Sequence, residues 1–251
     1  MLLGYVFRNK DTNNQKIVVT LRQKSNHNTY TDMRVINLGE QDSVINTYLS
    51  ELRDVNVQKD RMRFRHNIKR IGHAMAYEIS RILDYETKEV MTPLAPCNMN
   101  LIADKIVVST VFRAGLPFHQ AFLEVFDKAD NAFVSAFRYY KDKDRTDTGV
   151  RVEYMATPAL DGKTLLMVDP MLATGDSMAL AYEALKSKGT PKRLILASVI
   201  ASEPGVENMR RMFPSDDVVL VCAAIDPILN CHKYIVPGLG DAGDLMFGEK
   251  M

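Results

Sequence analysis

Short apolar runs alternate with amphipathic stretches along the chain after Pro93. The apolar runs are nearly continuous, which is typical of parallel strands that are buried on both faces. They predict six strands, at Lys105–Val111, Ala132–Phe137, Val150–Met155, Thr164–Val168, Leu194–Ala201 and Val218–Ala223. Helical spacing of apolar residues predicts helices near Gln120–Phe126, Ser177–Lys188 and Pro204–Met212. This alternation predicts an α/β fold, with a parallel sheet covered by helices on both faces.

A long amphipathic helix is expected before this region, from about Asp60 to Leu83. Its apolar residues recur at three- and four-residue intervals: Phe64, Ile68, Ile71, Met75, Ile79 and Ile82. Residues 1–34 are polar and Asn-rich and contain one β-like run, Lys16–Leu21. We expect them to form an N-terminal arm or extension, and residues 35–251 to form a single domain.

Composition and charge exclude several classes of protein. Hydrophobic residues make up 46% and charged residues 25% of the 251 residues, which is ordinary globular usage. The 32 Lys and Arg residues against 31 Asp and Glu residues leave a net charge of +1, which argues against nucleic-acid binding by the chain as a whole. No apolar run approaches the ~20 residues of a membrane span, and the N-terminus lacks the basic start of a signal peptide. Cys97, Cys222 and Cys231 lack paired spacing, so we expect reduced thiols in a cytoplasmic protein.

The turn after the fourth predicted strand is the first candidate for chemistry, because such sheets bind ligands at the carboxyl ends of their strands. It reads Asp169-Pro-Met-Leu-Ala-Thr-Gly-Asp-Ser177 and leads into a helix, which we expect Ser177 to cap. The backbone N–H groups and the hydroxyls of Thr174 and Ser177 suit a phosphate group, and Asp169 suits sugar hydroxyls. The turn is not a Walker A sequence, because no Gly-Lys-Ser/Thr follows the glycine. The alternative is an ordinary capped strand-to-helix turn.

Two arginines follow the first two predicted strands. Arg113 lies in Phe112-Arg-Ala-Gly-Leu116, and Arg138 follows Phe137. A guanidinium offers the bidentate donors that suit pyrophosphate, although either residue alone is equally typical of a surface ion pair. The charged stretch Lys141–Asp147 after Arg138 predicts a mobile loop or a solvated hairpin tip.

Glycines crowd the C-terminal segment Tyr234-Ile-Val-Pro-Gly-Leu-Gly-Asp-Ala-Gly-Asp244. Gly238, Gly240 and Gly243 match G-x-G-x-x-G, but too little chain follows for the strand and acidic residue of a dinucleotide-binding fold. Glycine lets a backbone approach a ligand closely, so this segment suits a flat base read by backbone N–H and C=O groups. The alternative is a glycine-rich coil.

These motifs, in this order, resemble the uracil phosphoribosyltransferases of the type I phosphoribosyltransferase superfamily. The segment Val168–Gly175 is similar to the family's loop for 5-phosphoribosyl-1-pyrophosphate (PRPP), and Pro237–Asp244 is similar to its uracil-binding loop. The Arg-Ala-Gly-Leu turn is similar to one that holds the pyrophosphate end of PRPP. The resemblance runs from about Val35 to the end of the chain and implies a type I phosphoribosyltransferase fold with a C-terminal base-binding hood.

The resemblance also implies an activity, the transfer of the phosphoribosyl group from PRPP to uracil to give UMP and pyrophosphate. The implied catalytic residues are Arg113, Arg138, Asp169 and Asp241. The implied PRPP-binding residues are Arg113, Arg138, Asp169, Pro170, Met171, Leu172, Ala173, Thr174, Gly175, Asp176, Ser177 and Asp241. The implied uracil-binding residues are Ile235, Gly240, Asp241 and Ala242.

Further implications of the resemblance concern cofactors and assembly. Mg²⁺ is expected to accompany PRPP, without a metal site made by the protein, and a flexible flap at Lys141–Asp147 is expected to cover PRPP. GTP activates some relatives. Because relatives form dimers and larger assemblies, we expect a homo-oligomer, a dimer or a tetramer.

Three departures from the family pattern leave alternatives open. Asp176 stands where the family usually has Gly, Leu245 replaces Arg or Lys, and Pro117-Phe118-His119 replaces Gly-Met and the residue after it. One alternative is a non-catalytic regulatory protein that binds uracil, UMP or PRPP, and another is a phosphoribosyltransferase for a different nucleobase. A basic cluster suits RNA or a nucleotide effector, although a solvated helix face or subunit contact is the simpler interpretation; it comprises Lys59, Arg61, Arg63, Arg65, Lys69 and Arg70.

Overall fold

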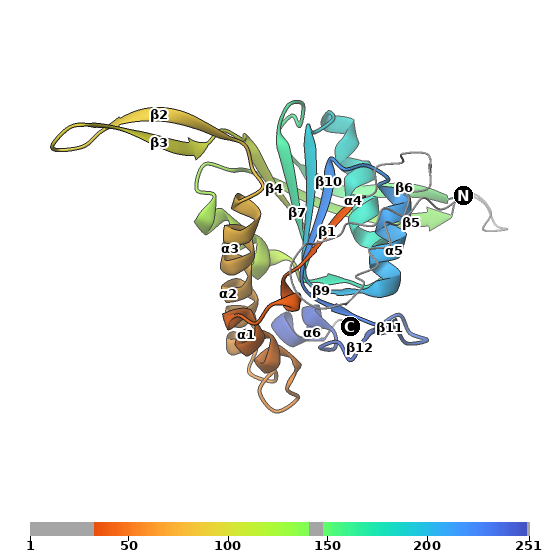
Figure 1. Cartoon of the computed structure of the whole chain (residues 1–251). Helices are drawn as coiled ribbons and strands as arrows, with labels where there is room; N and C mark the ends of the chain where they lie inside the picture. Colours follow the sequence, from red (N-terminus) through yellow and green to blue (C-terminus); the bar gives the residue numbers. More distant parts are fainter. Residues whose placement is uncertain (1–32, 141–147, 250–251) are drawn as a thin grey trace, which may run out of the picture. The chain divides into compact units, whose positions relative to one another are not determined.

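The computed structural model describes residues 33–140 and 148–249, and the side chains of 136–140 and 148–152 are outside the description. Residues 1–32 of the predicted arm and the predicted flap at Lys141–Asp147 therefore lie outside the described residues. An eight-stranded sheet forms the centre of the domain (Figure 1), and its strand order is β1-β10-β9-β7-β4-β5-β6, with β8 beside β9. The strands are β1 (Arg34–Asn37), β4 (Ile106–Val111), β5 (Asp130–Tyr140), β6 (Thr148–Ala156), β7 (Thr164–Val168), β8 (Met171–Leu172), β9 (Arg193–Ser202) and β10 (Val218–Asp226).

Nearly all neighbouring strands of this sheet are parallel, as the continuous apolar runs predicted. The exception is β6, which pairs antiparallel with β5 at the edge of the sheet. Only seven residues connect β5 to β6, whereas a parallel crossover needs a dozen or more. The predicted parallel sheet is therefore confirmed for every pair of strands except β5 and β6, whose short connection makes their pairing antiparallel.

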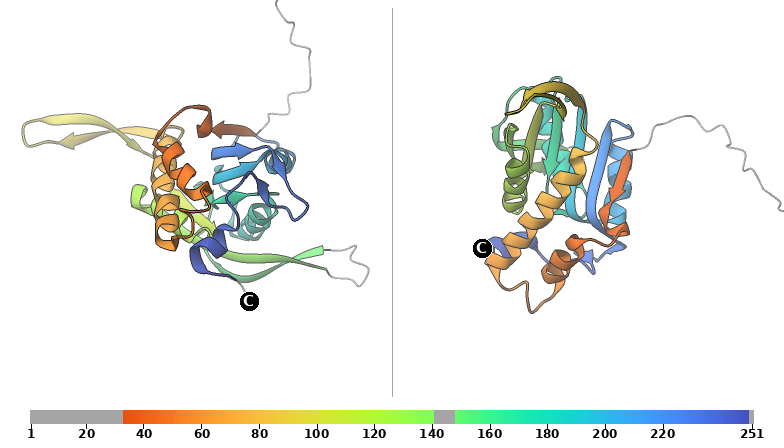
Figure 2. Two further views of the ribbon diagram at one scale, coloured as in Figure 1. Left: turned by 90° about the horizontal axis from the view of Figure 1, so that it is seen from below. Right: turned by 60° about the vertical axis from the view of Figure 1, so that its left-hand side comes forward.

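Helices cover both faces of the sheet, as predicted. One face carries α1 (Val44–Arg53), α2 (Arg61–Ser80) and α3 (Leu116–Val125), and the other carries α4 (Asp176–Leu185) and α5 (Glu203–Met212) (Figures 1 and 2). Two short 3₁₀ segments, η1 (Leu38–Glu40) and η2 (Lys186–Lys188), follow β1 and α4. Burial of apolar side chains between the helices and the sheet is the main source of stability.

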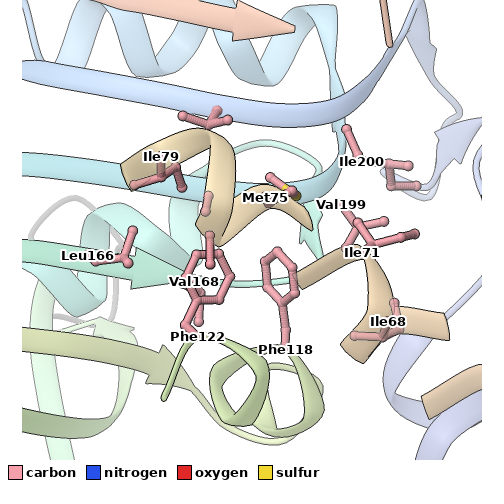
Figure 3. Packing of buried hydrophobic residues seen from close by; sticks show 14 of the residues in the cluster. Ile68, Ile71, Met75, Ile79, Phe118, Phe122, Leu166, Val168, Val199 and Ile200 are labelled. Carbon is pink, nitrogen blue, oxygen red and sulfur yellow. The ribbon is translucent and has the colours of Figure 1, made fainter. Parts of the chain in front are cut away.

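The long helix α2 begins directly after Asp60, which caps it. The carboxylate of Asp60 accepts hydrogen bonds from the backbone N–H groups of Met62 and Arg63, both at 3.0 Å. The apolar stripe of α2 packs with Phe118 and Phe122 of α3 onto the strands β7 and β9 (Figure 3). The predicted stripe residues Phe64, Ile68, Ile71, Met75 and Ile79 are each at most 1% exposed.

Two antiparallel strands, β2 (Tyr85–Met91) and β3 (Pro96–Ile102), form a hairpin that extends away from the sheet and helices (Figure 1). Every residue of both strands is exposed. This hairpin was not predicted from the sequence, because its strands lack both the continuous apolar run of a buried strand and clean alternation.

The C-terminal hood packs beside the carboxyl ends of the central strands. It consists of the short antiparallel pair β11 (Ile228–Leu229) and β12 (Ile235–Val236), followed by the helix α6 (Ala242–Phe247). Ile235, Leu239, Ala242 and Met246 are buried in the same core cluster as α1 and α2. The N-terminal helices therefore support the last segment of the described chain.

Candidate active site

A cavity of about 330 Å³ opens where β4 and β7 end, and three separate sequence motifs meet in its wall. The turn after β4 contributes Val111, Phe112, Arg113 and Ala114, the segment after β7 contributes Asp169, Met171 and Ser177, and the hood contributes His232, Lys233, Tyr234, Asp241, Ala242 and Gly243. Arg113, Asp169 and Asp241, predicted from motifs far apart in the sequence, thus share one cavity.

The segment after β7 places the predicted phosphate-binding residues at the beginning of α4. Gly175 precedes the helix with a φ of 81°, a conformation in which a side chain would be strained. The helix begins at Asp176, so Ser177 lies in its first turn and the expectation that Ser177 caps it was wrong. Asn208 and Ser202 donate hydrogen bonds to the carbonyl oxygens of Thr174 and Ala173, at 2.7 and 2.6 Å, and thereby hold the segment from behind.

The remaining residues of this predicted PRPP loop differ in how exposed they are to a ligand in the cavity. Pro170 and Gly175 are buried, and Leu172 packs in the core at 1% exposure, so any ligand contact of Leu172 is through its backbone. Met171 lines the cavity. Thr174 donates its hydroxyl hydrogen to the Asp176 carboxylate at 3.0 Å.

Asp169 is surrounded by protein but keeps part of its surface open to the cavity. Burial raises the pKa of its carboxyl to about 7, and the hydrogen bond that its carboxylate accepts from the Met171 N–H opposes this rise only in part. Near neutral pH this group therefore exchanges between a carboxylic acid and a carboxylate that can accept hydrogen bonds from a ligand's hydroxyl groups.

Arg113 connects the turn after β4 to the hood. Its Nη2 lies 2.8 Å from Oδ1 of Asp244, and its Nη1 donates a hydrogen bond to the carbonyl oxygen of Gly248 at 3.2 Å. Its Nε–H is buried and has no hydrogen-bond partner among the described residues. Because buried N–H groups are nearly always satisfied in folded proteins, this donor suits a ligand in the cavity.

Arg138, the second predicted pyrophosphate residue, lies within β5 rather than after its end, and pairs with Val150 of β6. The expectation that its strand ends at Phe137 was wrong, because pairing with β6 extends β5 to Tyr140. The side chain of Arg138 lies outside the described part of the structure.

The hood turns sharply at Gly238, which has a φ of 60°. A Cβ at this position would collide with the carbonyl oxygen of Ile235, so the turn requires glycine. Asp226, at the end of β10, accepts a hydrogen bond from the Gly238 N–H at 2.9 Å, and Arg53 of α1 donates one to the Gly238 carbonyl at 3.0 Å. Asp226 and Arg53 thus hold the N–H and the C=O group of Gly238 in place.

The predicted uracil-binding residues lie on both sides of this turn. Asp241 caps α6 by accepting a hydrogen bond from the Asp244 N–H at 2.9 Å, and it lines the cavity with Ala242. Ile235 is buried and Gly240 is exposed, and neither is in the cavity wall.

Seven residues of the cavity wall were not among the predicted site residues, namely Val111, Phe112, Ala114, His232, Lys233, Tyr234 and Gly243. Phe112 directly precedes Arg113, and His232, Lys233 and Tyr234 directly precede Ile235. Their position next to both motifs was the signal that could have found them.

None of the three departures from the family pattern is in the cavity wall. Phe118 and His119 are buried in α3, where the His119 ring packs against Phe133 and burial lowers the pKa of its imidazole. Leu245 packs against the core cluster from α6. The third departure, Asp176, is bonded to the Thr174 hydroxyl at the beginning of α4.

Most of the basic cluster predicted on the long helix makes contacts within the chain. Arg63 pairs with Glu51 at 2.9 Å, Lys69 pairs with Glu124 at 2.6 Å, and Arg65 donates a hydrogen bond to the Met246 carbonyl at 2.6 Å. Arg70 lies over the ring of Tyr48, with 5.2 Å from its Cζ to the ring centroid. These contacts favour a structural role for this helix face over nucleic-acid binding.

Comparison with known proteins agrees with this arrangement. The family model described as uracil phosphoribosyltransferase matches residues 40–249. A uracil phosphoribosyltransferase of Porphyromonas gingivalis is 51% identical over 219 residues, which cover 87% of this chain and all of that protein. One from Pyrococcus furiosus is 37% identical over 80% of this chain and 84% of that protein.

A solved structure shares the fold. The AQ2163 protein from Aquifex aeolicus is similar with a TM-score of 0.73 and 26% sequence identity, over 86% of this chain and 99% of that one. The family match covers the PRPP-like loop, the Arg113 turn and the glycine-rich hood, the three motifs that meet in the cavity. The chain therefore belongs to the uracil phosphoribosyltransferase family, with that family's α/β fold.

Proposed function

We propose that the protein transfers the 5-phosphoribosyl group from PRPP to uracil, giving UMP and pyrophosphate. The observation that carries this proposal is the single cavity whose wall contains Arg113, Asp169 and Asp241. The relatives that support uracil as the base are named uracil phosphoribosyltransferases and include one at 51% identity.

In the proposed reaction, each motif contacts one part of the substrates. Residues 173–177 at the beginning of α4 hold the 5′-phosphate, and Asp169 accepts hydrogen bonds from the ribose hydroxyls. Arg113 and Arg138 bind pyrophosphate, while Ile235 and residues 240–242 place uracil against the anomeric carbon. Catalysis then comes from positioning of the two substrates and from neutralisation of the charge on pyrophosphate.

Mg²⁺ is the proposed companion of PRPP. Among the described residues, no group of three or more His, Cys, Asp or Glu side chains forms a metal cage. Mg²⁺ is commonly held by one or two carboxylates together with waters and substrate phosphates, and Asp169 and Asp241 supply carboxylates in the cavity wall. Bound in this way, Mg²⁺ neutralises part of the pyrophosphate charge.

We also propose a homo-oligomer, and the β2–β3 hairpin is the feature that supports it. A two-stranded hairpin alone is marginally stable in water, and exposed apolar patches mark interaction sites. The exposed apolar residues of this hairpin are Tyr85, Val90, Met91, Leu94, Met99, Leu101 and Ile102. Light scattering during gel filtration tests the assembly, with Met91→Asp/Leu94→Asp expected to weaken it; a monomeric wild-type protein would contradict the proposal.

Three further proposals rest on the sequence. The first is that residues 1–34 form an N-terminal arm or extension and residues 35–251 form a single domain. We place the enzyme in the cytoplasm, because Cys97, Cys222 and Cys231 show no pairing. In the described part of the chain all three are free thiols. No helix in that part is long and apolar enough to cross a membrane. GTP as an activator rests on the resemblance to relatives that it activates.

The decisive experiment measures UMP formation by the purified full chain with uracil, PRPP and Mg²⁺. Adenine, hypoxanthine and orotate run in parallel, each with and without GTP, and Asp169→Ala serves as the impaired control. We expect the nucleotide product to form with uracil and with none of the other three bases. Product with another base would overturn the assignment of the hood to uracil, and ligand binding without any product would favour a regulatory protein.

A further inference from the structure

Lys233 has an unusual backbone conformation for its residue type. Its φ is 64°, and it is the one non-glycine residue with a positive φ among those that the structure describes. This region is disfavoured for residues that carry a Cβ, and glycine is the residue that adopts it most readily. Lys233 lies in the turn between β11 and β12 and lines the cavity.

The turn itself does not need a lysine. Asn230 holds it, because its Oδ1 accepts hydrogen bonds from the N–H groups of His232 and Tyr234, both at 2.9 Å. The Asn230 N–H donates to the Tyr234 carbonyl and the Lys233 N–H donates to the Asn230 carbonyl, again at 2.9 Å. Backbone and Asn230 thus fix the conformation at position 233, where glycine would fit with less strain. A lysine at this position is explained better by what its side chain does than by the fold.

The charges of the cavity wall indicate what that side chain does. Arg113 has one guanidinium nitrogen paired with Asp244 and another bonded to the Gly248 carbonyl. Lys233 is exposed, and its ammonium makes no ion pair or hydrogen bond with the described residues. Lys233 is therefore a positively charged residue of the cavity wall, and no described neighbour balances its charge.

Resting on the proposed function, we propose that Lys233 binds the pyrophosphate group of PRPP and of the product. The 5′-phosphate is already matched by the turn before α4, and the ribose by Asp169. Pyrophosphate is the densest anion in the reaction, and Nε is the one nitrogen of the Arg113 guanidinium that makes no hydrogen bond with a described residue.

Lys233 then stabilises the charge that forms as the group is transferred. The bond between the anomeric carbon and the pyrophosphate oxygen breaks, and its electron pair stays on that oxygen. Uracil N1 forms the new bond to the anomeric carbon, and its proton passes to water. An ammonium group beside the pyrophosphate oxygens neutralises the charge of the leaving group as it develops.

Isothermal titration calorimetry of the full chain with pyrophosphate in the presence of Mg²⁺ tests this role without any turnover. Lys233→Met removes the charge and keeps the length of the side chain, and Lys233→Arg keeps the charge. Lys128→Met is the matched control, since Lys128 is exposed and precedes β5 at the amino end of that strand, whereas the cavity opens at the carboxyl ends of β4 and β7. We expect Lys233→Met to raise the pyrophosphate Kd about fivefold, the size expected of one partly solvated ion pair. Lys233→Arg and Lys128→Met should leave it within about twofold.

Two further arms separate this role from the alternatives. UMP carries the 5′-phosphate and the base but no pyrophosphate, so its Kd should be unchanged by Lys233→Met. Lys233→Gly should weaken pyrophosphate binding as Lys233→Met does, while its Tm stays equal to or rises above that of the wild type. An unchanged pyrophosphate Kd in both variants, or an equal loss of UMP affinity, would overturn the proposal. Wild-type protein that binds pyrophosphate but forms no UMP would instead overturn the proposed function.

Discussion

Arg53 of α1 and Asp226 at the end of β10, directly before the hood, form a bidentate ion pair across 173 positions of sequence. Nη1 of Arg53 lies 2.8 Å from Oδ2 of Asp226, and Nη2 lies 2.7 Å from Oδ1. The Asp226 side chain is only 7% exposed, and both residues also bond the backbone of Gly238. The pair therefore determines where the proposed uracil loop lies, although neither residue is in the cavity wall.

Replacing Arg53 with lysine keeps the charge but removes the bidentate contact and the bond to the Gly238 carbonyl. We expect Arg53→Lys to lower the free energy of unfolding by about 1–2 kcal/mol, since the pair is partly solvated. The KM for uracil should rise several times more than the KM for PRPP. Steady-state kinetics and urea unfolding measure both effects.

The control is Arg63→Lys, because the Arg63–Glu51 pair is more exposed. It should change stability by at most about 0.5 kcal/mol and leave both KM values unaltered. Equal increases in the two KM values of Arg53→Lys would show that the pair does not act on the uracil loop selectively.

Arg113→Ala should reduce turnover with PRPP far more than it weakens contacts with uracil. The guanidinium contributes donors to the proposed pyrophosphate site, and loss of one such group commonly lowers kcat by ~10²–10³. Asp244→Asn is the matched variant, because it removes the charge opposite Arg113 and keeps an oxygen acceptor. It should alter the KM for uracil while kcat changes much less. Unchanged kinetics of Arg113→Ala would refute the assignment of this arginine.

The sheet was predictable because buried parallel strands appear in the sequence as continuous apolar runs. The run Thr164–Val168 coincides with β7, and the stripe of α2 is the one that packs on the core. The β2–β3 hairpin was not predictable by this argument, since its residues are exposed and no burial pattern marks them. The direction of β6 depended on the length of its connection rather than on its apolar residues.

The candidate site was predictable to the extent that its residues follow strands or belong to local motifs. Asp169 and Arg113 follow buried strands, so their meeting at one edge is a consequence of parallel topology. The Arg53–Asp226 pair had no local signal, because it joins two segments that only the folded chain brings together. The conformation of Lys233 was equally hidden, since Asn230 imposes it through bonds within the turn.

The carboxyl of Asp169 should make both stability and activity depend on pH. Its pKa is raised from 3.8 to about 7, so the folded protein retains a proton that the unfolded chain has released between these values. The stabilisation that the protonated Asp169 carboxyl gives to the folded protein at low pH is therefore lost as the pH rises from 3.8 through about 7. Asp169→Asn should be more stable than the wild type by roughly 2–4 kcal/mol at pH 8, and the difference should vanish near pH 4.

Activity should follow the opposite course, because the carboxylate is the form that accepts hydrogen bonds from ribose hydroxyls. The kcat/KM for PRPP should rise with pH through about 7 in the wild type and lose this step in Asp169→Asn. Urea unfolding and initial rates across the pH range measure the two trends. A stability difference that is constant with pH would contradict the raised pKa.

Asp241 has two roles that substitution can separate, because it caps α6 and also lines the cavity. Asparagine caps helices about as well as aspartate, so Asp241→Asn should leave stability within about 0.5 kcal/mol of the wild type. Asp241→Ala loses the hydrogen bond to the Asp244 N–H and should cost about 1 kcal/mol. If the carboxylate acts on the substrates, both variants should lose a similar share of kcat/KM for uracil. If Asp241→Asn keeps full activity and only Asp241→Ala is impaired, the residue acts through the helix cap alone.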